Sequence, residues 1–210
     1  MKKRVAVLIS GRGSNMEVLV GACEAQDYPA QIVGVMSNKV DAKGLEFAAA
    51  KGIPAIAVPH KAYGSREAHD AALHEALMSL QPDIGACAGY IRIMTPEFVV
   101  KWQGRMINIH PSLLPKYPGL HTHKRALRAG DSTHGASVHF VTAELDGGPV
   151  IAQARVDVQT GDTPETLAAR LLPHEHRLLV ACVRALASRE LRWSDSGIQF
   201  GGSRLPRPLM

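Results

Sequence analysis

The first half of the chain alternates between short apolar runs and helical patterns, and this alternation restricts the fold more than any other feature of the sequence. The runs are rich in Val, Ile and Ala, as expected for strands buried on both faces. Strand–helix alternation at this spacing predicts a mostly parallel sheet with helices on both faces. The expected strands are residues 4–10, 31–37, 55–58, 83–90 and 106–110, and the expected helices are residues 15–26, 42–51 and 65–80, with Thr95-Pro96 as a further helix start.

The second half of the chain departs from this pattern. Residues 134–158 hold two alternating or β-branched runs on either side of Asp146-Gly147-Gly148-Pro149, which predicts an antiparallel excursion. A long helix is expected from about residue 163 to residue 188, with Pro173 kinking or interrupting it.

The last residues and the domain organisation follow from the same patterns. From Leu191 onward the sequence predicts a hairpin and then a loose terminus. A chain of 210 residues that is 46% hydrophobic is long enough for one well-buried domain. We therefore expect a single domain over residues 1–190, with residues 191–210 as a C-terminal hairpin and tail of the same domain.

A glycine loop follows the first expected strand in "VAVLISGRGSNMEVL". Gly11 and Gly13 allow a tight turn that exposes backbone N–H groups at a helix N-terminus, where an anion binds well. Met16 stands where the dinucleotide motif G-x-G-x-x-G needs its third glycine, so one phosphate fits better than a pyrophosphate. An alternative explanation is structural, because Ser14 with Glu17 three residues later matches a capping box.

The stretch "NIHPSLLPKYPGLHTH" places an amide and an imidazole two residues apart at the end of an expected strand. Because side chains alternate along a strand, Asn108 and His110 should share one face and Ile107 and Ile109 the other. An amide donor beside an imidazole can stabilise the oxyanion of a tetrahedral intermediate. No nucleophile-elbow pattern surrounds Ser112, which favours direct transfer between two substrates over a covalent intermediate.

Asp146 has two interpretations. A carboxylate in a Gly-Gly turn is usually a turn former. If the turn folds back to the sheet edge, however, Asp146 would orient His110 and favour its protonated state.

Composition excludes several classes of function. The net charge of +5 suits anionic small molecules, but the basic residues are scattered and aromatic residues, at 5%, are too sparse for a base-stacking platform, so we expect no nucleic-acid partner. The apolar run of residues 5–9 is too short for a signal peptide, and no segment approaches the roughly 20 apolar residues that span a bilayer. We expect a cytoplasmic protein with small-molecule substrates and no membrane partner, as a monomer or a homodimer. The three cysteines, without C-x-x-C spacing, are expected to be reduced.

The histidines raise the question of a metal. His121-x-His123, His134, His139, His174 and His176 lie in the second half, but no H-E-x-x-H or Cys/His spacing accompanies them, so we expect no metal.

Several separated motifs together resemble the phosphoribosylglycinamide formyltransferase family of folate-dependent transformylases. They are "LISGRGSN", "AGYIRIMTPEFV", "GRMINIHPSLLPKYPGLHTHKRAL" and "HGASVHFVTAELDGGPVI", and the resemblance extends to about His176. It implies a Rossmann-like formyltransferase fold. It also implies that 10-formyltetrahydrofolate is a co-substrate. Its formyl group would be transferred to the amine of glycinamide ribonucleotide, N1-(5-phosphoribosyl)glycinamide, in de novo purine biosynthesis.

The resemblance also implies roles for individual residues. Asn108, His110 and Asp146 match the catalytic trio, and Gly13, Ser14 and Asn15 match the phosphate loop, with Glu175 as a carboxylate on the glycinamide side. The expected folate contacts are Arg66, Ile91, Arg92, Ile93, Met94, Asn108, Thr142, Ala143, Glu144, Leu145 and Asp146.

Three other functions share parts of this evidence. Formyltetrahydrofolate hydrolase and methionyl-tRNA formyltransferase are similar around the Asn-x-His element, but each carries a further domain for which we expect no room here. A non-catalytic folate- or nucleotide-binding module is the other alternative, and the complete Asn108, His110 and Asp146 set argues against it.

Overall fold

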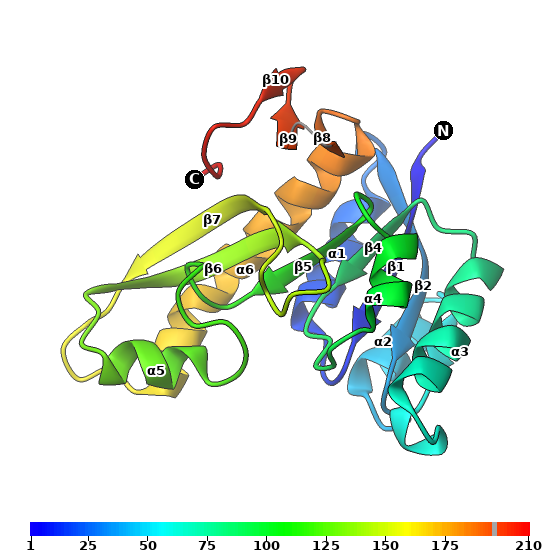
Figure 1. Ribbon diagram of the computed structural model, residues 1–210, viewed down its shortest axis with the longest axis horizontal. Helices are drawn as coiled ribbons and strands as arrows, with labels where there is room; N and C mark the ends of the chain where they lie inside the picture. The colour runs from blue at the N-terminus through cyan, green and yellow to red at the C-terminus, as the bar shows by residue number, and fades with distance from the viewer. Residues whose placement is uncertain (195–196) are drawn as a thin grey trace.

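The computed structural model describes residues 1–194 and 197–210, and a seven-stranded sheet forms its centre (Figure 1). The strand order is β3-β2-β1-β4-β5-β6-β7. The first five strands in chain order pair in parallel, whereas β6 pairs antiparallel with both β5 and β7. The strands are β1 (Lys3–Ile9), β2 (Ala30–Ser37), β3 (Ala55–Ala57), β4 (Ile84–Cys87), β5 (Met106–His110), β6 (Thr133–Phe140) and β7 (Val150–Asp157). The predicted α/β class and its antiparallel excursion are confirmed.

Helices cover both faces of this sheet because its central strands are apolar on both sides. In β1, Val5, Val7 and Ile9 pack into one core cluster, while Ala6 and Leu8 pack into the other. The first cluster includes residues of α1 (Ser14–Glu24), α2 (Lys43–Ala50) and α6 (Pro164–Ala187). The second includes residues of α3 (Arg66–Ser79) and α4 (Pro96–Lys101), which begins at the predicted Thr95 N-cap.

The strand order reverses between β1 and β4, and this reversal positions the site. From β1 the chain moves outward through β2 and β3, and then returns to β4 and moves the other way through β5. In open α/β sheets, ligands bind in the crevice at the carboxyl ends of the strands where the order reverses. The glycine loop follows β1 and residues 88–95 follow β4, so both lie at this edge. The hydroxyl of Ser10 joins them by accepting a hydrogen bond of 2.7 Å from the amide of Ile91.

In the C-terminal part, the expectations of an interrupted helix and of a loose terminus are wrong. Pro173 does not interrupt α6, which runs from Pro164 to Ala187, because its apolar stripe, including Leu171 and Leu179, packs on the sheet. Nor is the terminus loose, since Leu209 donates to Ile151 of β7 and accepts from Gln153.

The predicted C-terminal hairpin is present as paired strands. These are β8 (Leu191–Ser194) and β9 (Gly197–Phe200), with β10 (Ser203–Arg204) beyond them; residues 195–196 of the expected hairpin lie outside the described part. Figure 1 shows this small sheet beyond the end of α6. Helix α5 (Thr122–Arg128) was not predicted, because it is short and basic.

Candidate active site

Asn108 and His110 project from β5 toward the same face of the sheet. Their neighbours Ile107 and Ile109 belong to the core cluster on the opposite face, as the period of two predicts. His110 is buried at the strand's end, where Pro111 follows and the chain leaves the sheet. The two side chains therefore meet at the carboxyl edge, beside the loop that follows β4.

Both ring nitrogens of His110 face an oxygen. Nε2 lies 2.9 Å from the carbonyl oxygen of Tyr117, and because a carbonyl only accepts, Nε2 carries a proton. Nδ1 lies 3.4 Å from Oδ2 of Asp146. Tyr117 has a left-handed backbone (φ 57°), and its hydroxyl donates to Asp131 over 2.8 Å. The loop after β5 is thus tied down where its carbonyl meets the imidazole.

Asp146 lies in the turn between β6 and β7, which folds back against β5. The same Oδ2 atom that faces His110 accepts a 2.8 Å hydrogen bond from the amide of Gly119. Burial raises the pKa of the Asp146 carboxyl, but the neighbouring imidazole of His139, the hydrogen bond from the Gly119 amide and the neighbouring imidazole of His110 together outweigh burial, so the pKa lies below its ordinary value. Asp146 is therefore ionised at neutral pH.

The pKa of His110 differs from the sequence-based expectation. Burial lowers this pKa, while the Tyr117 carbonyl and the Asp146 carboxylate raise it. Burial dominates, so the pKa lies below 6.5 and the ring is mostly neutral at neutral pH. Asp146 raises the pKa of His110, as expected, but not enough to keep the ring protonated at neutral pH in the free protein.

A cavity of about 540 Å³ opens beside these three residues. Its lining includes every expected folate contact except Arg66, which is exposed at the start of α3. Ile91, Ile93, Leu120 and Leu145 all line the cavity and are between 47% and 61% exposed, although large apolar side chains are usually buried. Nε of Arg92 is buried there without a partner within the described part of the chain. The cavity therefore suits a flat, largely apolar ligand that also carries an acceptor.

The capping-box explanation of the glycine loop is wrong. The N-cap is Gly13, in a left-handed conformation (φ 79°) that favours glycine, and Ser14 is already the first helical residue. No N-cap side chain accepts a hydrogen bond from the first turn, so these backbone N–H groups lack the partner that a side-chain cap would supply.

Glu175 lies beside this loop, held on the continuous helix α6. Its Oε2 accepts a 3.0 Å hydrogen bond from Nδ2 of Asn15, and burial raises the pKa of this carboxyl above its ordinary value. Oδ1 of Asn15 is buried and has no partner among the described residues. A buried unpaired oxygen is costly, which points to a ligand that donates a hydrogen bond here.

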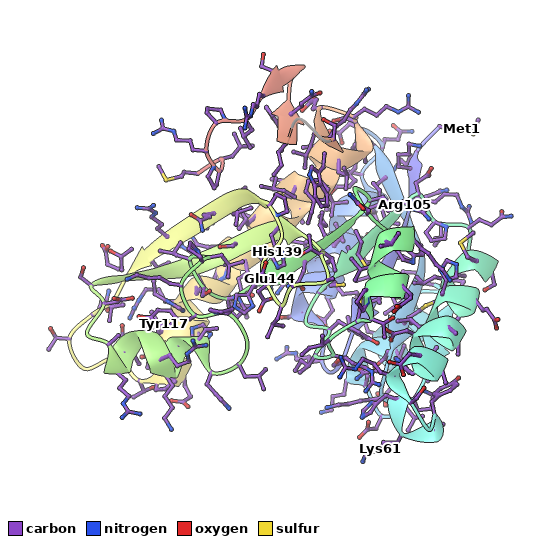
Figure 2. The ribbon with its side chains drawn as sticks, viewed as in Figure 1. Met1, Lys61, Arg105, Tyr117, His139 and Glu144 are labelled. Atoms are coloured by element: carbon purple, nitrogen blue, oxygen red, sulfur yellow. The ribbon has the colours of Figure 1, made fainter. Side chains whose placement is uncertain are left out.

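His139 is the main site residue to which the sequence assigns no role beyond its place among the histidines weighed for a metal. It lies on β6 and lines the cavity, and Glu144 in the turn after β6 lines it too; both are labelled in Figure 2. Its Nε2 is 3.1 Å from Nδ2 of Asn108 and 3.6 Å from Oδ1 of Asp146. The antiparallel register that places His139 opposite Asn108 has no signature in the sequence, since it depends on how β6 pairs with β5.

The described residues contain no group of three or more His, Cys, Asp or Glu side chains that could hold a metal ion. Within residues 1–194 and 197–210, no helix has the length and apolar character needed to cross a membrane. All three cysteines are free and buried, and burial raises the pKa of the thiol of Cys23 to about 11.

Comparisons with known proteins identify the family. A family model described as formyl transferase matches residues 3–183. The phosphoribosylglycinamide formyltransferase of Escherichia coli (strain K12) is 46% identical over 202 residues, which cover 96% of this chain and 95% of its own. The solved structure of the Coxiella burnetii phosphoribosylglycinamide formyltransferase in complex with CHES has a TM-score of 0.93 and 40% identity, over 98% of this chain and 96% of its own. The trifunctional purine biosynthetic protein adenosine-3 of Bos taurus is 43% identical over 93% of this chain but only 19% of its own length.

Proposed function

The chain belongs to the formyl transferase family, and on that premise we propose that it transfers a formyl group to the amine of phosphoribosylglycinamide in de novo purine biosynthesis. The donor is a folate-type molecule, which we assign as 10-formyltetrahydrofolate. The observation that carries the proposal is that Asn108, His110 and Asp146 line one cavity, with Nδ1 of His110 3.4 Å from Asp146. Ile91 in the wall of this cavity is hydrogen-bonded to Ser10, the residue before the glycine loop.

The two substrates have separate places at this edge of the sheet. The flat pterin fits the apolar wall of Ile91, Ile93 and Leu145, and the buried Nε of Arg92 suits an acceptor on the folate. The ribonucleotide phosphate fits the N-terminus of α1 at Gly13, Ser14 and Asn15. The unpaired Oδ1 of Asn15, next to Glu175, suits a donor on the same substrate.

The proposed reaction is a direct transfer. The amine nitrogen attacks the formyl carbon on N10 of the folate, a carbon–nitrogen bond forms, and the carbonyl oxygen becomes an oxyanion. Asn108 donates to this oxygen. His110 meets the substrates as a neutral ring. Because its Nε2 already carries a proton, its Nδ1 accepts the proton that the attacking amine releases.

The resulting imidazolium pairs with Asp146 through Nδ1, and its positive charge stabilises the oxyanion electrostatically. The bond between the formyl carbon and N10 then breaks, and a water held by Asp146 passes the proton from His110 to N10. Because both substrates are held in place, proximity can contribute about 7–11 kcal/mol in well-oriented cases.

One assay separates this function from its alternatives. The absorbance of the folate is followed with and without phosphoribosylglycinamide. Loss of the formyl group only when the acceptor is present supports the transferase. Loss without the acceptor would indicate a hydrolase, and binding without any loss would indicate a non-catalytic module.

A further inference from the structure

His139 and Asn108 face each other across the β5–β6 pair. They are direct Cα partners in the antiparallel register, and the ring of His139 is only 3% exposed. Nε2 of His139 lies 3.1 Å from Nδ2 of Asn108, within hydrogen-bond distance. A fixed backbone register on each side therefore holds the contact.

The other ring nitrogen determines which form of His139 is present. Nδ1 lies 2.9 Å from the carbonyl oxygen of Phe140, and a carbonyl can only accept. The proton of the neutral ring is therefore on Nδ1, and Nε2 presents a lone pair. This lone pair accepts a hydrogen bond from the side-chain amide of Asn108.

The accepted hydrogen bond selects one orientation of the amide. With the amide reversed, Oδ1 of Asn108 would face the lone pair of Nε2, and two acceptors would repel each other. In the selected orientation one hydrogen on Nδ2 is used by His139 and the second remains free. Asn108 and His139 both line the cavity, so this second hydrogen is available to the reacting oxygen.

Asp146 is the competing partner of the same nitrogen. Its Oδ1 is 3.6 Å from Nε2 of His139, beyond a direct hydrogen bond, whereas Asn108 is 0.5 Å closer. We propose that His139 is a positioning residue: it acts through Asn108, as the acceptor that holds the amide in the orientation that binds the oxyanion. This inference rests on the proposed formyl transfer.

Two substitutions separate the two halves of the ring. His139→Gln places an amide oxygen near the position of Nε2, so it can still accept from Asn108. His139→Asn places an amide nitrogen near Nδ1, so it keeps the bond to Phe140 and offers no acceptor to Asn108. We expect kcat to stay within about 5-fold of wild type in H139Q and to fall about 10²–10³-fold in H139N, the usual loss for one oxyanion donor, with the KM of both substrates nearly unchanged. Equal losses in the two variants would overturn the proposal.

A double-mutant cycle tests whether the effect passes through Asn108. In an Asn108→Ala background, H139N should lower kcat no further, because the group that it positions is gone. In an Asp146→Asn background, the loss from H139N should remain in full. The reverse pattern would show that His139 acts through Asp146 and would overturn the proposal.

A further test observes the ring of His139 directly in the wild-type protein. NMR of protein labelled with ¹⁵N-histidine should show the His139 ring with its proton on Nδ1, with the signal assigned by its absence in H139Q. A proton on Nε2 would overturn the proposal even if H139N does not fold. Failure of the proposed function is distinguishable, because the wild-type protein would then transfer no formyl group at all.

Discussion

At the scale of single residues, His110 is set by contacts from three segments that are separate in the sequence. β5 presents the ring, the left-handed Tyr117 turns its carbonyl toward Nε2, and the turn after β6 brings Asp146 to Nδ1. Each contact removes freedom from the ring. The residue is therefore held for proton transfer before any substrate arrives.

Replacing His110 with alanine should lower kcat by about 10²–10⁴-fold, the usual contribution of a positioned acid–base group. The fold should survive, because the ring lies at the sheet edge and the main core clusters remain intact. Steady-state kinetics and circular dichroism together check this. His174→Ala, at the surface beside Arg177, is the matched control and should keep wild-type turnover. Near-native turnover in H110A would remove His110 from the mechanism.

Replacing Asp146 with asparagine should change the titration of His110 in a defined direction. The carboxylate raises the pKa of the ring against the effect of burial, so its removal should lower this pKa further below 6.5. NMR titration of the His110 ring in the wild-type protein and in Asp146→Asn measures this directly. An unchanged or higher pKa in the variant would show that Asp146 does not act on His110 electrostatically.

At the scale of secondary-structure elements, the sequence predicts what depends on periodicity and misses what depends on pairing. Asn108 and His110 share a face because a strand has a period of two, and the parallel strands follow from apolar runs. The sequence does not identify Tyr117 or His139 as site residues, because a left-handed backbone conformation and an antiparallel register leave no local pattern in the sequence. The expected strand 83–90 ends at Cys87, since Gly89 (φ 84°) turns the chain out of the sheet and into the cavity wall.

The turn that carries Asp146 depends on the absence of a side chain at Gly148. A Cβ there would overlap the carbonyl oxygen of Phe140 at the end of β6, and a backbone atom cannot rotate away. Gly148→Ala should therefore move the turn, lower kcat strongly through Asp146 and reduce the unfolding free energy by roughly 1–3 kcal/mol.

Gly64→Ala is the matched control for this substitution. A Cβ at Gly64 meets no atom within 4 Å, so both kcat and the melting temperature should change little. Thermal melting and kinetics of the two variants side by side provide the measurement. If G148A keeps wild-type turnover, the position of Asp146 is not set by this close approach.

At the scale of the whole molecule, burial of histidine rings links stability to pH. The pKa values of His74, His110, His123, His134 and His176 all lie below 6.5, and burial is the largest cause in each. His134 shifts most, to about 4, because it is buried with the ring of His123 3.0 Å from its Nε2. Its lowered pKa means that the folded protein excludes a proton that the unfolded chain accepts.

The sign of the resulting pH dependence follows from proton uptake. Between the lowered folded-state pKa and 6.5, the unfolded chain binds more protons, so unfolding becomes easier as the pH falls through this window. Above 6.5 the contribution to stability is complete. For His134 the window extends from 6.5 down to about 4, which corresponds to about 3 kcal/mol at most.

Urea unfolding at pH 7 and pH 5 should therefore show a clear loss of stability in the wild-type protein. His134→Gln should be less stable at pH 7, because it replaces a buried ring. Since glutamine cannot titrate, the variant should lose less unfolding free energy than the wild-type protein on going to pH 5. His174→Gln at the surface should retain the wild-type loss. If H134Q loses as much stability as the wild-type protein between the two pH values, the titration of His134 does not contribute to acid unfolding.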